Sequence, residues 1–243
     1  GFTYTIPNDG VYYDTSKFKD YGKMAKLDIE GLKAGARIDM TEGKRNITDF
    51  ALWKFSQTGE KRQMEWPSPW GVGFPGWHIE CSAMSMAHLG DHFDIHCGGI
   101  DHIPIHHTNE IAQTEAVTGK KWVNTWMHGE FLLIDKSKMA KSGDNFTTLQ
   151  TLIDKGYSPI DYRYFLLGAQ YRSKLNFSWE ALDGAKIAWD KLRERVREFR
   201  TQNTLKPGKS FEKHKAAFED AINDDLNMPI ALSVLWAVVK DET

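Results

Sequence analysis

The feature that most constrains the fold is a strand, glycine turn, helix and strand in succession between residues 92 and 128. HFDIHC alternates apolar and polar side chains and runs into Gly98-Gly99, as a strand entering a tight turn does. A helix is predicted from near Pro104 to Gly119, and a second strand from Trp122 to His128. This order predicts a parallel α/β sheet, whose ligands lie beyond the carboxyl ends of its strands.

The segments before this unit give weaker patterns. Alternating residues from Phe2 to Asp14, broken by PNDG, predict a hairpin. KRNITDFALWKFSQ has roughly helical spacing and predicts a short helix over Thr48 to Ser56. Residues 59–77 hold three prolines and four glycines, too many for any regular element, so we expect a structured loop whose aromatic residues approach a ligand or a partner. His78 to Gly90 predicts a helix with a glycine C-cap.

The segments after it change in character along the chain. FLLIDK predicts a short strand, and a Lys/Ser/Gly loop and two helices follow it. From Ser178 the pattern is helical, with Ser178 as N-cap and an apolar face running from Leu182 to Phe199. A second helical stretch spans about 211–239 with a break at 227–229. We therefore expect antiparallel bundle helices, with the change from α/β to all-α near residue 175.

Composition sets the wider limits. The 243 residues are 41% hydrophobic, enough for a real core, and the net charge of −2 gives no bulk basic field. Two cysteines cannot make a disulfide framework for this length, and most of the nine histidines lie near them, which favours a reducing compartment and metal chemistry. The sequence shows neither a signal peptide nor a membrane-spanning apolar run, so a cytoplasmic protein is expected. It begins within a predicted strand and without Met, as a fragment would.

Cys81, His106 and Glu110 form the first group that could carry chemistry. Helix positions i and i+4 lie about 5–6 Å apart, so His106 and Glu110 project together, and a thiolate from another helix would complete three zinc ligands. His107 also faces Glu110, so spacing alone does not select the histidine. The competing interpretation is a buried cysteine and a surface histidine. Cys97 alternates along its strand and is expected to be a packed core thiol outside the metal site.

Two further groups point to phosphate or ribose binding. Lys138 and Lys141 lie three residues apart on a Gly-bounded loop and could neutralise phosphates, although a solvated basic loop is the simpler interpretation. Gly98 and Gly99 follow a strand and would let the backbone approach a ligand, with Asp101 placed to bond ribose hydroxyls. An ordinary strand-to-helix turn would look the same.

Taken together, these motifs resemble those of cysteinyl-tRNA synthetases, class I aminoacyl-tRNA synthetases, across nearly the whole chain. The matching segments occur in the order of that family: KRN--DF-LWK, WPSPWG-G-PGWHIECSAM, HFDIH-GG-D, HH-NEIAQ, WMH, KMAKS for the KMSKS loop, RYFLL-A-YRS-LN-S and DDLN-P-AL. Long consecutive matches of this kind are highly specific.

The resemblance implies a role for each matching residue. Cys81, His106 and Glu110 correspond to three of four zinc ligands, and Trp77 and His78 to positions beside the cysteine pocket. The residues implied on the nucleotide side are the turn residues Gly98, Gly99 and Asp101, Met127 of WMH, and the catalytic lysines Lys138 and Lys141, of which Lys141 contacts ATP phosphates.

The family pattern also has parts that this sequence does not show. The half of the nucleotide fold with the HIGH motif and the fourth zinc ligand, a cysteine, is absent, and the anticodon-binding region extends past Thr243. The resemblance thus implies an insertion region at 1–65, the second half of a Rossmann-like catalytic domain at 66–130, a KMSKS-loop subdomain at 131–175 and the start of a helical bundle at 176–243. Ala140 and Thr108 replace the usual Ser and Glu at positions with no assigned ligand role.

The implied activity is ATP-dependent formation of cysteinyl-adenylate, followed by transfer of cysteine to tRNA(Cys), with Zn²⁺ selecting the thiolate and Mg²⁺ assisting at the phosphates. The isolated fragment is expected to be inactive. Three alternatives are a cysteine:amino-sugar ligase of the mycothiol pathway, a non-catalytic zinc-binding module, and a zinc hydrolase. The hydrolase is disfavoured because the motif offers no separate general base.

Overall fold

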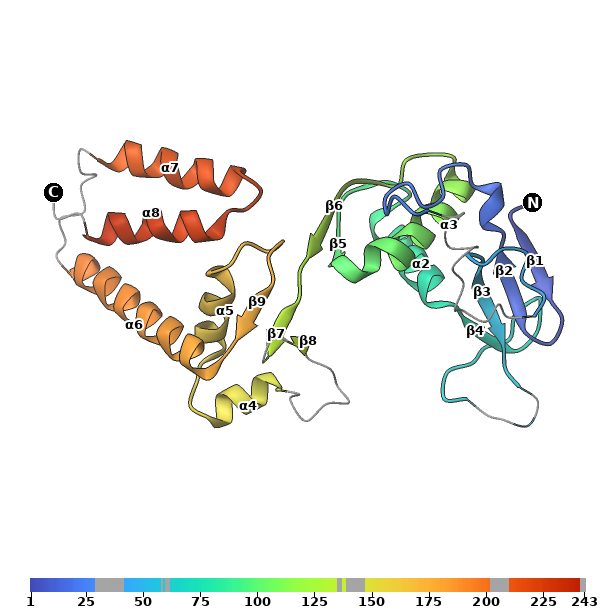
Figure 1. The fold of residues 1–243 in the computed structure, drawn as a ribbon, viewed down its shortest axis with the longest axis horizontal. Coiled ribbons are helices and arrows are strands. Elements are labelled where there is room, and N and C mark those ends of the chain that lie inside the picture. The colour runs from blue at the N-terminus through green and yellow to red at the C-terminus, as the bar shows by residue number, and fades with distance from the viewer. Residues whose placement is uncertain are drawn as a thin grey trace. The chain divides into compact units, whose positions relative to one another are not determined.

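The computed structural model describes residues 1–28, 42–57, 59, 62–134, 137–138, 147–201 and 210–240, with only the backbone described at 137–138. Its elements form two compact units, Gly1–His128 and Gly129–Thr243 (Figure 1). Each unit is described by itself below. Both mix helices and strands, so the class is α/β in the broad sense.

The first unit begins with an antiparallel sheet of four strands in chain order. These are β1 (Thr3–Ile6), β2 (Gly10–Tyr13), β3 (Phe50–Phe55) and β4 (Gly73–Pro75). The predicted hairpin is confirmed, with Thr3 opposite Tyr13 and Ile6 opposite Gly10. Pro7 and Asn8 form its turn, where Asn8 has φ 61°, a backbone conformation that asparagine tolerates better than most residues.

Two predictions in this sheet were wrong. The expected helix over Thr48 to Ser56 is strand β3, because Phe50 and Leu52, two residues apart, both pack against the Tyr13 cluster. A period of two buries these side chains on one face, so tertiary packing prevails over the helical spacing. The loop over 59–77 was expected to lack regular structure, yet Gly73–Pro75 pairs with β3 as β4.

The rest of the first unit follows the predicted strand, helix, strand order. It comprises α2 (Trp77–Leu89), β5 (Phe93–Gly99), a short 3-10 turn η2 (Ile100–His102), a π-helical turn η3 (Ile103–His107), α3 (Thr108–Thr118) and β6 (Val123–Gly129). Gly90 and Gly119 cap the two α-helices, as predicted. Strands β5 and β6 pair with each other. Asp94 bonds Asn124, and two residues further along both strands His96 contacts Trp126, so the two strands run in the same direction, as a parallel pair does.

Cys97 does not pack as predicted. Its side chain is exposed, and so is Ile95 (56%), whereas His96 turns toward α3 and is only 15% exposed. Burial along β5 therefore does not follow the alternation in HFDIHC: His92 and Asp94 are exposed like Ile95, whereas Phe93 and His96 are half-buried. The reason is that His96 meets a cluster of aromatic and histidine rings, including Trp122 and Trp126.

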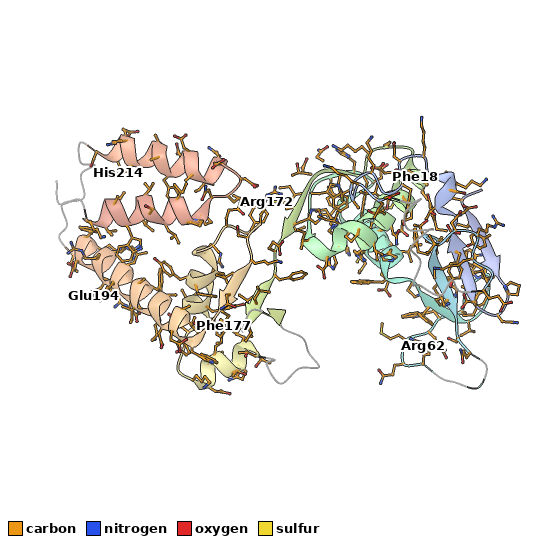
Figure 2. All side chains as sticks on the ribbon, viewed as in Figure 1. Phe18, Arg62, Arg172, Phe177, Glu194 and His214 are labelled. Atoms are coloured by element: carbon orange, nitrogen blue, oxygen red, sulfur yellow. The ribbon has the colours of Figure 1, made fainter. Side chains whose placement is uncertain are left out.

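The second unit begins with a small sheet and two helices. Strand β7 (Leu132–Ile134) pairs in parallel with β9 (Leu175–Phe177) and antiparallel with β8 (Ser137–Lys138). Strand β9 was not predicted. Helices α4 (Leu149–Asp154) and α5 (Pro159–Leu167) carry the capping boxes of Thr148 and Ser158. Leu152, Phe165 and Phe177, the last of which is labelled in Figure 2, form a core with Leu182 of the helix that follows β9.

Three helices complete this unit: α6 (Trp179–Thr201), α7 (Phe211–Asn223) and α8 (Met228–Lys240). Ser178 caps α6 as predicted, with its Oγ accepting from the Ala181 N–H at 3.2 Å. Helices α7 and α8 lie side by side (Figure 1), and the break between them falls at 224–227, slightly before the predicted 227–229. On the apolar face of α6, Leu182 and Leu192 are buried while Val196 is 37% exposed.

Candidate metal centre

Helix α2 carries the first site residue. It begins after Gly76, whose extended backbone serves as N-cap, so Trp77 and His78 lie in its first turn and Cys81 one turn later. Trp77 is 58% exposed, while His78 and Cys81 are half-buried. The start of α2 thus presents an aromatic ring, an imidazole and a thiol within five residues.

The wide turn η3 and helix α3 carry the other residues. The Thr108 hydroxyl donates to the Ile103 carbonyl at 2.7 Å, which satisfies an oxygen that the widened turn leaves without its α-helical partner. His106 and His107 come at the end of η3, and Glu110 follows in the first turn of α3. All three are buried, with exposures of 5%, 1% and 0%.

The structure brings Cys81, His106 and Glu110 together. One ligand atom from each lies within 4.8 Å of the others, and His106 Nε2 is 3.8 Å from Glu110 Oε1. His96, His107 and Glu110 form a second group, in which one ligand atom from each residue also lies within 4.8 Å of the others. This group uses the other carboxylate oxygen of Glu110. His96 Nε2 and His107 Nε2 lie 3.4 and 3.8 Å from Glu110 Oε2. The ambiguity between His106 and His107 thus has a structural basis, since each faces one oxygen of Glu110.

The two consecutive histidines are held by other histidines through their second ring nitrogen. His78 Nδ1 lies 3.0 Å from His106 Nδ1, and His128 Nε2 lies 2.8 Å from His107 Nδ1. A histidine that binds a metal through one nitrogen is usually oriented by a hydrogen bond at the other. His106 and His107 both have that arrangement, with Nε2 directed at Glu110.

Burial sets the charges of the group. It raises the pKa of Glu110 to about 8, and it lowers the pKa of His78 and His106 to about 4 and that of His107 to about 3. The pKa of Cys81 is raised by burial and by the neighbouring Glu110. At neutral pH the imidazoles are therefore neutral and offer lone pairs, whereas the thiol and the carboxyl hold their protons unless a cation replaces them.

A divalent cation fits this group. Both oxygens of Glu110 are buried and have no hydrogen-bond partner within the described residues, which is costly for a carboxyl group that nothing else satisfies. Thiolate, imidazole and carboxylate together are a donor set that suits zinc, and three protein donors leave one position open. The geometry therefore supports metal binding at Cys81, His106 and Glu110.

The residues expected on the nucleotide side are only partly described. Gly98 and Gly99 end β5, Asp101 is exposed in η2, and Met127 is half-buried on β6. The backbone of Lys138 lies in β8, while its side chain and all of Lys141 fall outside the described residues.

Gly98 has a packing role that the sequence did not reveal. A Cβ built there would lie 2.5 Å from His107 Cε1 and 2.8 Å from His102 Nδ1. The bare backbone therefore gives the histidine rings their space.

Sequence reasoning missed most of the ring cluster. Trp126 lies 4.8 Å from both His96 and His107 between ring centroids, and His102 lies 5.0 Å from His106. The density of histidines between residues 78 and 128 was the available signal. It could not show which rings converge, because they come from α2, β5, η2, η3 and β6.

The aromatic loop before α2 borders a separate apolar groove with a volume of about 630 Å³. Trp66 and Trp70 are 44% and 57% exposed and line it together with Met84 of α2. These aromatics lie at the surface, as expected of a loop that approaches a ligand or partner. Among the helices described, none is long and apolar enough to cross a membrane.

Comparison with known proteins identifies the class. Residues 1–187 match the family model for the catalytic domain of class I (C) tRNA synthetases, and the chain belongs to this family. At the level of fold, 73% of the chain aligns with 28% of the LeuRS chain in a LeuRS–tRNA–LeuAMS complex from Agrobacterium radiobacter K84, with a TM-score of 0.53 and 12% identity. That likeness concerns the fold alone.

The individual relatives in the sequence comparison share one name, cysteine–tRNA ligase. The chain is 53% identical over 241 residues to cysteine–tRNA ligase 1 of Burkholderia lata, covering 99% of this chain and 50% of that protein. It is 48% identical over 263 residues to cysteine–tRNA ligase of Treponema denticola, covering 100% of this chain and 53% of that protein. The chain thus spans about half the length of the curated relatives it matches.

Proposed function

We propose that the protein carrying this chain is a cysteine–tRNA ligase, which activates cysteine with ATP to cysteinyl-adenylate and transfers it to tRNA(Cys). The observation that carries the proposal is the buried Cys81, His106 and Glu110 group beside Trp77 and His78, in a chain about half identical to two proteins of that name. This activity would place the protein in the cytoplasm, with tRNA and ATP.

Under this proposal the chain divides by role. Residues 66–130 would be the second half of a Rossmann-like catalytic domain and 1–65 an insertion region that supports it. Residues 131–175 would form the subdomain of the KMSKS-type loop, and 176–243 the start of a helical bundle. The parallel β5 and β6 pair and the site at the start of α2 and α3 support the first of these assignments.

Zinc held by Cys81, His106, Glu110 and the fourth, cysteine ligand that the resemblance implies would take up a substrate thiolate as a further ligand. A serine hydroxyl is a harder and poorer ligand and would not be held in the same way. The protein side chains then prepare the site. His78 orients His106, and its own low pKa keeps it neutral, so it adds no positive charge beside the metal. Trp77, whose ring centroid lies 4.3 Å from that of His106, would cover one side of the cysteine pocket.

The nucleotide would lie near the carboxyl end of β5. Gly98 and Gly99 would form the turn beside the ribose, and Asp101 would accept from its hydroxyls. Met127 would contact the adenine side. Lys138 and Lys141, with Mg²⁺, would neutralise the pyrophosphate that leaves when the cysteine carboxylate attacks the α-phosphate.

The test uses protein expressed from the complete reading frame that carries this chain. Cysteine-dependent ATP–pyrophosphate exchange and charging of tRNA(Cys) should both be observed, with serine giving neither. Cys81→Ser should lower bound zinc and exchange together. Cys97→Ser is the matched control, because Cys97 is an exposed cysteine on β5, and it should change neither. Absence of exchange with cysteine, or full zinc retention by Cys81→Ser, would overturn the proposal.

A further inference from the structure

A buried amide joins the two helices that carry the metal centre. Gln113 on α3 is 6% exposed, and its Nε2 donates to the His78 carbonyl at 2.6 Å and to Ser82 Oγ at 2.5 Å. Thr114 Oγ1 also donates to Ser82 Oγ, at 2.9 Å. Ser82 and Thr114 are buried as well, with exposures of 4% and 2%.

These contacts lie one helical turn or less from the ligands on both helices. On α2, His78 and Ser82 bracket Cys81 in the sequence. On α3, Gln113 follows Glu110 by three residues and so shares its face of the helix. We propose that Gln113 is a positioning residue for the metal centre, which fixes the separation between Cys81 on α2 and Glu110 on α3. The inference rests on the metal site of the proposed function.

The other side of α3 is already held in place. The Tyr13 hydroxyl donates to the Ala112 carbonyl at 2.9 Å, and the Tyr21 hydroxyl donates to Asn109 Oδ1 at 2.6 Å. Helix α3 is thus anchored to the hairpin side of the unit. The start of α2 is held to β3 by the Gly76 N–H, which donates to the Leu52 carbonyl at 2.9 Å, and Gln113 adds the direct bond from α3 to the turn of α2 that carries Cys81. A metal site tolerates ligand displacements of only about 0.2 Å, so a small shift of α2 would matter.

The amide oxygen of Gln113 does not stabilise the fold. This atom, Oε1, is buried and has no hydrogen-bond partner among the described residues. A buried acceptor without a partner destabilises a folded protein. A methionine of similar length would remove that acceptor together with the amide donors. A residue that only stabilised the fold would be expected to lose stability on this change, whereas a positioning residue would lose metal affinity instead.

The experiment separates these two effects in protein expressed from the complete reading frame that carries this chain. Cobalt titration, followed by absorption of the thiolate-bound ion, and zinc competition against a chelator give the metal affinity, and thermal unfolding with chelator gives the metal-free stability. Gln113→Met should weaken zinc binding about 10- to 100-fold, as changes in residues that orient metal ligands do. Its metal-free unfolding temperature should change little, because removal of the unpaired Oε1 offsets the loss of the two bonds donated by Nε2.

Thr15→Val is the matched control. Thr15 is 4% exposed in the same unit, and its hydroxyl bonds Asp49 and Thr48, far from α2 in the hydrogen-bond network. This variant should lower the unfolding temperature and leave zinc affinity unchanged. Ser82→Ala is the second test variant, since it removes the acceptor shared by Gln113 and Thr114, and it should also weaken zinc binding.

Zinc affinity that stays at the wild-type value in both Gln113→Met and Ser82→Ala would overturn the positioning role alone. A second outcome would also overturn the positioning role: zinc affinity that falls in proportion to metal-free stability in all three variants, Thr15→Val included. Gln113 would then be a structural residue only. A wild-type chain that binds neither cobalt nor zinc would overturn the metal centre itself, and the positioning role with it.

Discussion

The hydroxyl of Tyr21 donates to Asn109 Oδ1 at 2.6 Å, one residue before Glu110 on α3. Asn109 is 1% exposed, so this bond satisfies an acceptor that water cannot reach. It connects the segment after the N-terminal hairpin to the helix that carries the candidate ligands. The hairpin region therefore helps to support the site from a distant part of the sequence.

Tyr21→Phe should destabilise the first unit by about 1–3 kcal/mol, because it leaves the buried Asn109 oxygen without its donor. Chemical unfolding of the variant measures the loss. Tyr157→Phe serves as the control, because its hydroxyl bonds an exposed carboxylate, Asp183, and its removal should cost little. Equal stability of Tyr21→Phe and wild type would show that Asn109 finds another donor.

The metal-free chain should be most stable near pH 7. The pKa of His78, His106 and His107 is lowered by burial to about 3–4, so between there and pH 6.5 the unfolded state binds more protons and stability rises with pH. The pKa of Glu110 is raised from 4.5 to about 8, so the folded state keeps a proton that the unfolded state loses, and stability falls through that range. Below about pH 7 the three histidines outweigh the one carboxyl; above it the carboxyl dominates.

The decline from about pH 7 to pH 8 should not exceed about 1.4 kcal/mol per pH unit. It is measured by unfolding in the presence of a chelator across this range. Glu110→Gln should remove the decline because a glutamine has no proton to lose. A decline of the same size in that variant would assign it to other groups.

Gly98→Ala should destabilise the first unit by about 1–3 kcal/mol, because the added methyl group would force the rings of His107 and His102 to move. The contrasting variant is Gly184→Ala in α6, where a Cβ meets nothing within 4 Å. Alanine in that helix should raise stability by about 0.5–1 kcal/mol. Thermal unfolding of both variants tests the pair, and a neutral Gly98→Ala would show that the rings adjust freely.

Arg172→Ala should loosen the turn between α7 and α8. Arg172 Nε lies 2.6 Å from Asp225 Oδ2, and the Tyr171 hydroxyl donates to Asp225 Oδ1 at 2.6 Å, which keeps the pKa of Asp225 below its usual range (Figure 2). Asp225 and Leu226 have φ of 51° and 55°, which non-glycine residues adopt only when their surroundings hold them there. Hydrogen exchange at 224–227 should become faster, while exchange in α4 stays the same.

Local patterns predicted the elements whose signals lie within a few neighbouring residues. The hairpin at Pro7, the glycine caps at Gly90 and Gly119 and the Ser178 N-cap depend on backbone preferences that neighbouring residues already show. The β3 strand could not be predicted, because its conformation depends on Tyr13, about forty residues away in the sequence. The exposure of Cys97 depends likewise on rings contributed by β6.

In the candidate site, too, contacts within one helix could be predicted from the sequence and contacts between helices could not. Spacing on one helix placed His106 beside Glu110, and the structure agrees within 3.8 Å. The approach of Cys81 needed the packing of α2 on α3, which no local pattern contains. Spacing therefore offered Cys81 only as a candidate, the family resemblance then assigned it the same role, and neither indicated Gln113.

The π-helical turn at Ile103–His107 changes the rotational phase of the helix that carries the site. Such a turn holds one residue more than an α-helical turn, so the residues before it are rotated by about 100° relative to where a regular helix would place them. Deleting one residue from this turn would leave a well-formed helix and an unchanged composition of histidines. It would nevertheless rotate Asp101 and His102 away from His106 and Glu110, so the length of this turn is as much a part of the site as the side chains themselves.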